Sequence, residues 1–130
     1  MPFPIADEQL DKAEVEIGAA LPSAYREAMK RENGGEFETD TDDWILHPIF
    51  DTTDRKRIAR TANHVLLETK QAMKWAGFPR NGLCVGHNGA GDLLVFLGNG
   101  QIIGDALYAW RHETGETELI ATDFADVPKG

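Results

Sequence analysis

The chain has 130 residues, of which 27% are charged and 42% hydrophobic, and its formal net charge is −9. A chain of this length can bury a working core without disulfide staples, so we expect a single domain over residues 1–130. The charged fraction argues against wholesale disorder, and the acidic balance argues against DNA or RNA as the main partner, because carboxylates repel phosphates.

The first eight residues contain no basic segment, and the apolar runs of the chain are too short to cross a bilayer. We therefore expect no signal peptide, no membrane contact and a cytoplasmic location. The single cysteine, Cys84, lies between Leu83 and Val85, which predicts a buried thiol and fits a reducing compartment.

Two helices are predicted near the N-terminus. Apolar residues at helical spacing predict a helix over residues 6–17, which Gly18 can end in a left-handed conformation. A second helix is predicted over residues 24–32, with Ser23 as its N-cap. The Asn-Gly-Gly sequence at residues 33–35 ends it, because these residues tolerate positive φ.

The middle of the chain predicts an acidic edge strand or loop from residue 36, a short strand over residues 44–46, and a third helix. That helix could run from residue 55 to residue 75, and the preceding Thr52-Thr53-Asp54 offers a cap. A break near Asn63 is possible, because asparagine competes with helix hydrogen bonds. Its other face is basic. Its apolar face would consist of Ile58, Ala62, Val65, Thr69, Ala72, Met73 and Ala76.

A strand is predicted over residues 92–97, whose last five residues are all apolar. Because they show no polar alternation, both faces of this strand should be covered, which makes it the central strand of a sheet. Further strands are predicted over residues 82–86, 106–111 and 117–121, with a half-turn of helix near residues 123–127. Helices followed by strands indicate an α+β fold, with a mainly antiparallel sheet of about five strands packed against the N-terminal and middle helices.

Few patterns indicate catalysis. The glycine-rich turn at residues 88–92 lacks the ending of a P-loop and leads into a strand, which favours a hairpin turn with Asp92 bonded to turn amides. No histidine has a second ligand at the spacing of a metal site, so we expect no metal and no cofactor. Ser23 is the only serine and resembles a helix cap, which disfavours nucleophilic catalysis. An acid/base pair such as Asp92 with Glu113 stays open.

Charge is unevenly placed along the chain. Residues 55–80 hold seven basic residues and one acidic residue, and a solvated helix face is favoured there over a nucleic-acid contact, because aromatic residues are not interleaved with the charges. Five carboxylates fall within eight residues, a density that can steer a cationic protein and raise its association rate by roughly 10–10³ at low salt. The alternative is a solvated loop. These carboxylates are Glu36, Glu38, Asp40, Asp42 and Asp43.

Five short motifs resemble, in their order, the SUKH superfamily, which is named partly for yeast cell-wall-assembly regulators of the Smi/Knr type. The resemblance covers about residues 8–124. The motifs are Glu14…Gly18…Leu21-Pro22-x-x-Tyr25, Asn33-Gly34-Gly35, Trp44-Ile45-Leu46-x-Pro48, Asn88-Gly89-x-Gly91-Asp92 and Tyr108-x-Trp110-x-His112-Glu113-Thr114.

This resemblance implies an α+β domain without catalysis. Bacterial members resemble immunity proteins that bind and neutralise toxins, often nucleases, and eukaryotic relatives act as regulatory scaffolds. The positions that match the family framework are expected to determine the fold, and they are Glu14, Gly18, Leu21, Pro22, Tyr25, Gly34, Gly35, Gly91, Asp92 and Trp110.

The resemblance and the charge together predict an immunity protein, a monomer or weak dimer, that occludes a basic toxin domain such as a nuclease. The alternatives are a regulatory scaffold or binding module with a non-toxin partner, and a small enzyme that uses carboxylates around Asp92. The predicted contact residues are Glu36, Glu38, Asp40, Asp42 and Asp43.

Overall fold

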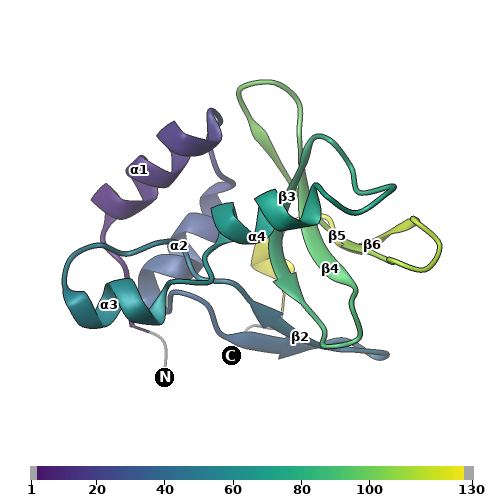
Figure 1. Cartoon of the computed structure of the whole chain (residues 1–130), viewed down its shortest axis with the longest axis horizontal. Coiled ribbons are helices and arrows are strands. Elements are labelled where there is room, and N and C mark those ends of the chain that lie inside the picture. The colour runs from purple at the N-terminus through teal and green to yellow at the C-terminus, as the bar shows by residue number, and fades with distance from the viewer. Residues whose placement is uncertain (1–2, 128–130) are drawn as a thin grey trace.

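The computed structural model describes residues 3–127, and Figure 1 shows its helices packed against a curled sheet. In chain order the elements are α1 (Asp7–Ile17), α2 (Ser23–Arg31), β1 (Glu36–Glu38), β2 (Asp43–Leu46), α3 (Arg55–Arg60), α4 (Val65–Ala72), β3 (Gly82–His87), β4 (Leu93–Gly98), β5 (Ile103–Trp110), β6 (Thr117–Ala121) and the 3₁₀ turn η1 (Phe124–Asp126).

The strands form one sheet in the order β1-β2-β3-β4-β5-β6, and each neighbouring pair is antiparallel. The predicted α+β class is confirmed. The sheet has six strands where about five were predicted, and residues 36–38 form the short acidic edge strand. An isolated parallel bridge joins Ala20 to Ile102, next to the start of β5, which begins three residues earlier than predicted.

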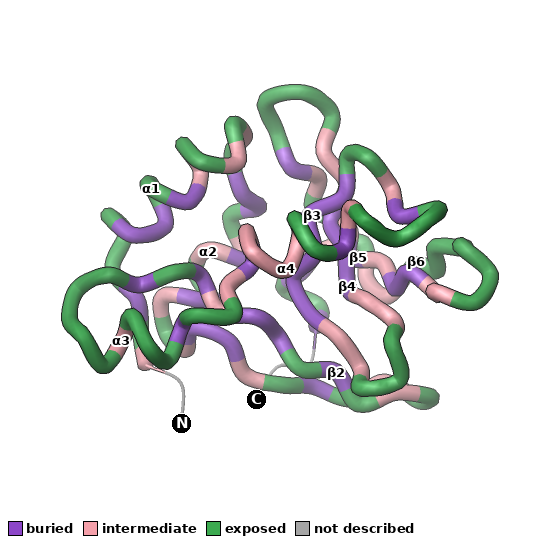
Figure 2. Tube along the Cα trace, viewed as in Figure 1, coloured by how far each residue is buried: buried purple, intermediate pink, exposed green. Residues whose placement is uncertain are grey.

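Strand β4 is covered on both faces, as predicted from its apolar run. Leu94 and Phe96 are fully buried in the main core with residues of α1 and α2. Val95, between them, is fully buried on the opposite face with Ala72 of α4. Figure 2 shows the buried stretch of β4 between half-buried ends. We call the face under α1 and α2 the inner face and the face under α4 the outer face.

The predicted helix over residues 55–75 is two helices, broken where Asn63 suggested a break. The Thr61 hydroxyl donates to the Arg57 carbonyl oxygen at 2.8 Å, and the His64 Nδ1 accepts from the Leu67 amide at 3.2 Å, so α3 ends and α4 begins within a few residues. The prediction of one continuous apolar face along this segment was therefore wrong. Ile58 in α3 is 41% exposed, because the turn separates it from the axis of α4.

The expected helix ends had different outcomes. Gly18 has φ 80° and its amide donates to the Glu14 carbonyl oxygen at 2.8 Å, as predicted. The prediction of Ser23 as the N-cap was wrong. Ser23 is the first residue of α2, and Pro22 occupies the cap position without a side-chain hydrogen bond. The Glu14 carboxylate instead accepts from the Leu21 amide at 2.7 Å, which stabilises the connection between the helices.

Candidate protein-binding surface

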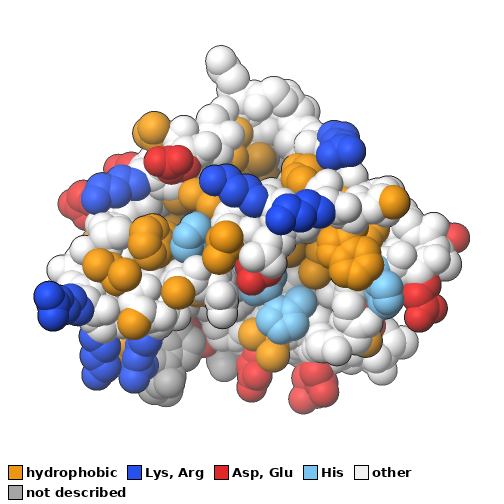
Figure 3. Space-filling model, in the orientation of Figure 1, with side chains coloured by type: hydrophobic (Ala, Val, Ile, Leu, Met, Phe, Trp, Pro, Cys, Tyr) orange, Lys and Arg blue, Asp and Glu red, His pale blue; other side chains and the backbone are white. Residues whose placement is uncertain are grey.

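Charged side chains are unevenly distributed over the surface of the molecule. Figure 3 shows Lys and Arg side chains over α3 at the lower left, and Asp and Glu side chains along the lower and right-hand margins, over β2 and the β5–β6 end of the sheet. Three cations of α3 also gather over the ring of Phe3, with centroid distances of 4.7 to 5.6 Å, and these are Lys56, Arg57 and Arg60. The protein is thus basic at α3 and acidic at the β1–β2 hairpin.

The five predicted contact residues all lie on this hairpin, but strand alternation divides them between the two faces of the sheet. Phe37 and Trp44 are buried in the main core, so their neighbours in β1 and β2 project from the outer face. Asp40, in the turn, is also exposed. The exposed carboxylates of the outer face are Glu36, Glu38 and Asp43.

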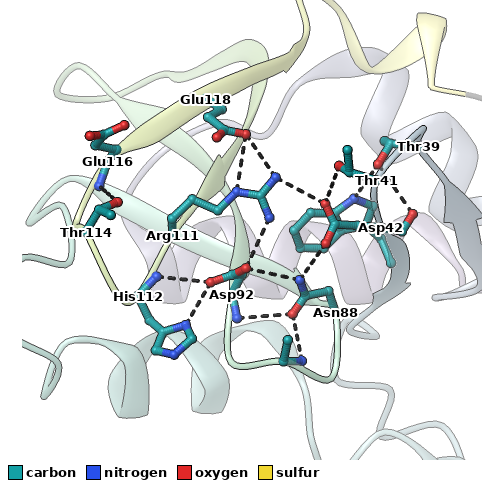
Figure 4. Close-up of polar contacts among 12 residues, drawn as sticks. Thr39, Thr41, Asp42, Asn88, Asp92, Arg111, His112, Thr114, Glu116 and Glu118 are labelled. Carbon is teal, nitrogen blue, oxygen red and sulfur yellow. Dashed lines mark hydrogen bonds and ion pairs between the residues drawn. The ribbon is translucent and has the colours of Figure 1, made fainter.

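Asp42 is directed the other way, into a polar cluster at the end of the inner face (Figure 4). The Arg111 guanidinium donates to Asp42 and Asp92, both at 3.1 Å, and to Glu118 at 2.9 Å. It also lies 5.7 Å from the centre of the buried Trp44 ring. We call this set the Arg111 cluster, and its members are Asp42, Asn88, Asp92, Arg111, His112 and Glu118.

Four strands bring the cluster together at one end of the sheet. Asp42 precedes β2, Asp92 precedes β4, Arg111 follows β5, and Glu118 lies in β6. Because neighbouring antiparallel strands begin and end beside one another, these positions meet although Asp42 and Arg111 are 69 residues apart. The cluster therefore joins the acidic hairpin to the β5–β6 turn.

The turn at residues 88–92 is a hairpin turn, as predicted, but its bonds differ from the expectation. The Asn88 side-chain oxygen accepts from the amides of Ala90 at 2.9 Å and Asp92 at 3.1 Å. Asp92 itself accepts from the His112 backbone amide at 3.1 Å and from the His112 ring at 2.7 Å. The prediction that Asp92 bonds the turn amides was therefore wrong, because Asn88 bonds them and the Asp92 carboxylate points towards the end of β5.

The environment of Asp92 favours its ionised form. Burial alone would raise the pKa, but hydrogen bonds from the ring and amide of His112, from Arg111 and from Asn88 outweigh it and lower the pKa to about 2. A general acid or base works best with a pKa near the working pH. Asp92 is thus poorly suited to an acid/base pair with Glu113, although both residues line the same pocket. Within residues 3–127, no hydroxyl or thiol is hydrogen-bonded to His112.

Stability should fall in acid because of Asp92. Its pKa is depressed in the folded state relative to about 3.9 in an unfolded chain, so its stabilising contribution is present above pH 4 and is lost as the pH falls towards 2. We expect this contribution to be about 1–2 kcal/mol. Urea unfolding of the wild type and of Asp92→Asn at several pH values measures it. Equal pH slopes for the two proteins would contradict the assignment.

A second acidic segment, residues 113–118 around the β5–β6 turn, lies beside the hairpin. It was not predicted from the sequence as part of the binding surface. A pocket of ≈ 510 Å³ opens between the two segments, and among residues 3–127 Arg111 is the one arginine or lysine that lines it. The carboxylates of its wall are Asp42, Asp92, Glu113, Glu116 and Glu118. The three glutamates within residues 113–118 were visible in the sequence, but their position next to the hairpin follows only from the contacts of Arg111.

A pair of histidines lies beside the cysteine. His47 Nε2 and His87 Nδ1 are 2.8 Å apart, and Cys84 Sγ lies 3.9 Å from His47 Nδ1. Burial raises the pKa of Cys84 to about 12 and lowers the pKa of His47 to about 4, so both groups are neutral near pH 7. The prediction of a buried thiol is confirmed. Across the described part of the chain, no group of three or more His, Cys, Asp or Glu residues could hold a metal ion, and no helix is long and apolar enough to cross a membrane.

The residues expected to form the family framework occupy structural positions. Leu21, Tyr25 and Trp110 are buried, and Tyr25 packs edge-on against Phe96 with ring centres 5.1 Å apart. Gly91 has φ 98°, and a Cβ added there would lie 3.0 Å from the His112 ring, so the glycine lets that ring reach Asp92. These positions thus support the fold and the Arg111 cluster.

A family model described as the SMI1 / KNR4 family (SUKH-1) matches residues 4–127. No curated protein and no solved structure matches the chain. The family match spans nearly the whole sequence and includes all five motifs that carry the SUKH resemblance. The chain therefore belongs to the SMI1 / KNR4 family (SUKH-1).

Proposed function

We propose that this protein is a non-catalytic protein-binding domain of the immunity type, which binds a basic toxin domain in the cytoplasm and blocks it. The observation that carries the proposal is the joining of two acidic segments, the β1–β2 hairpin and the β5–β6 turn, into one surface through Arg111. Family membership supports it, because bacterial SUKH relatives resemble immunity proteins.

The chemistry of a nuclease explains why an acidic surface suits such a partner. A nuclease binds a polyanion and must carry Lys and Arg side chains where the phosphates bind. Carboxylates that face those cations attract the toxin domain and occupy the site that its substrate needs. Electrostatic attraction of this kind acts mainly on the association rate and weakens with salt.

The predicted contacts divide into two roles in this proposal. Glu36, Glu38, Asp40 and Asp43 face solvent and would meet the partner directly. Asp42 accepts from Arg111 and from Asn88, at 2.9 Å, so it would hold the hairpin in place beside the rest of the acidic surface.

Co-expression with a cognate toxin domain, which the immunity role predicts the neighbouring reading frame to encode, tests the function. We expect the wild-type protein to restore growth. A variant with Glu36, Glu38, Asp40 and Asp43 all changed to Lys should lose protection, and its association rate with an inactive toxin domain should fall about tenfold or more at low salt, because the steering charge is reversed.

A matched control separates local charge from net charge. Changing Glu8, Glu16, Asp105 and Asp126 to Lys alters the net charge equally at exposed sites away from the hairpin, and should leave protection intact. If the toxin domain stays equally lethal with and without the wild-type protein, the immunity role is wrong, and a regulatory scaffold with a non-toxin partner takes its place.

A further inference from the structure

We infer that the partner docks on the outer face of the sheet, with Ile45 and Trp75 as apolar anchors and with carboxylates of the β1–β2 hairpin beside Ile45. The inference rests on the proposed function and names the surface that performs it. The occupant is a protein surface with an exposed apolar centre and Lys or Arg side chains around it.

Strand register places one row of side chains across the whole outer face. Residues directly opposite each other in antiparallel strands share a face. The pairings therefore run without a gap from β1 to β6 through Glu36, Ile45, His87, Leu93, Trp110 and Thr117. At about 4.8 Å per strand, Ile45 and Trp110 lie about 14 Å apart, which is within the width of an ordinary protein interface.

Both anchors are apolar and exposed. Ile45 is 47% exposed and Trp75 is 51% exposed, whereas Trp110 beneath Trp75 is fully buried. Trp75 packs edge-on against Trp110 with ring centres 6.4 Å apart, and its ring lies 6.0 Å from the His112 ring. A large ring held in this way loses little conformational freedom on binding, and tryptophan is enriched among residues that dominate binding energy.

Carboxylates flank the Ile45 anchor. Glu36 lies directly opposite Ile45, and Glu38 lies opposite Asp43 in the next row of the same face. A groove of ≈ 740 Å³ beside them is lined by Glu36, Glu38 and Asp43 together with Phe37, Trp44, Ile45 and Asn88. An apolar centre with a charged rim is the usual anatomy of a protein interface, and this rim selects a cationic partner.

The acidic pocket of the inner face extends the acidic surface that Arg111 joins, but it offers fewer free carboxylates than the outer face. Its Asp42 and Asp92 are each only 15% exposed and already accept hydrogen bonds from Arg111. A partner cation there would compete with a bonded guanidinium, whereas Glu36, Glu38 and Asp43 on the outer face are exposed to solvent.

Ile45→Lys and Ile102→Lys form a matched pair of test variants. Ile102 is 60% exposed and lies in the β4–β5 connection, at the opposite end of the strands. In a titration of the inactive toxin domain from the neighbouring reading frame, Ile45→Lys should raise Kd about tenfold or more, because it removes an anchor and adds a cation. Ile102→Lys should change Kd less than about twofold. Trp75→Ala, with its fold checked by thermal unfolding, should match Ile45→Lys.

The outcomes separate this inference from the function on which it rests. If the wild type does not bind the toxin domain, the proposed function fails and the docking surface fails with it. If the wild type binds and both anchor variants bind equally well, only the docking surface is overturned. A wild-type dimer in sedimentation that Ile45→Lys dissociates would also overturn it, because a second copy would then occupy this face.

Discussion

Leu94→Ala is expected to lower the free energy of unfolding by about 2–5 kcal/mol, the largest effect of any single substitution considered for this protein. Leu94 is fully buried at the centre of β4, between β3 and β5. Alanine there removes the transfer free energy of the lost carbons and leaves a cavity. The side chain also packs closely against Gly86, where an added Cβ would meet it at 2.8 Å, and a glycine has no side chain that could fill the cavity.

Urea unfolding of Leu94→Ala at pH 7 measures the loss, and an unchanged m-value would show that the native state is still compact. Leu119→Ala in β6 is the matched control, because Leu119 is 55% exposed and its truncation should cost less than about 0.5 kcal/mol. A loss below about 1 kcal/mol for Leu94→Ala would mean that the inner face of β4 is not the centre of the core.

Arg111→Met is expected to cost about 2–3 kcal/mol, because it leaves three carboxylates without their shared cation. Arg111 is 20% exposed, and two of its partners, Asp42 and Asp92, are 15% exposed. Methionine preserves part of the apolar stem near Trp44, so most of the loss should be electrostatic. Arg111→Lys should recover only part of it, since an ammonium group cannot match a planar guanidinium that bonds three carboxylates.

Measuring the stability loss of Arg111→Met at two pH values distinguishes an electrostatic contribution from a packing contribution. Without Arg111 the carboxylates repel one another when ionised, and this repulsion disappears as they are protonated. The difference between the wild type and Arg111→Met should therefore be larger at pH 7 than at pH 3. Arg55→Met, at an exposed position of α3, should stay within about 0.5 kcal/mol of the wild type at both values. A pH-independent loss for Arg111→Met would assign the effect to packing.

The Arg111 cluster links stability to the proposed binding role. It connects Asp42 of the hairpin to Glu118 of β6, so weakening it should let the two acidic segments move apart before the core unfolds. A variant such as Arg111→Met is therefore expected to lose toxin-domain affinity even at temperatures where it is folded.

The middle of the chain shows where local patterns stop being sufficient. The periodicity over residues 55–75 is helical throughout, and helix is what forms on both sides of the turn at residues 61–64. Whether the helix is interrupted at this turn depends on hydrogen bonds from the preceding loop, which lies outside the segment. Thr61 accepts from the Asp51 amide at 3.0 Å, and the Val65 amide donates to the Pro48 carbonyl oxygen at 2.9 Å, so the preceding loop holds the break in place.

The sequence by itself determined the α+β class, the buried central strand, the left-handed helix end at Gly18 and the acidic character of the hairpin. Each of these depends on residues adjacent in the chain, whose spacing and side-chain chemistry act locally. Only the tertiary structure decided that Asp42 turns inward to Arg111 while its neighbour Asp43 faces outward, and that the β5–β6 turn lies beside the hairpin. Those contacts join residues as far as 69 positions apart, and they arise from the pairing of six strands, which no local pattern specifies.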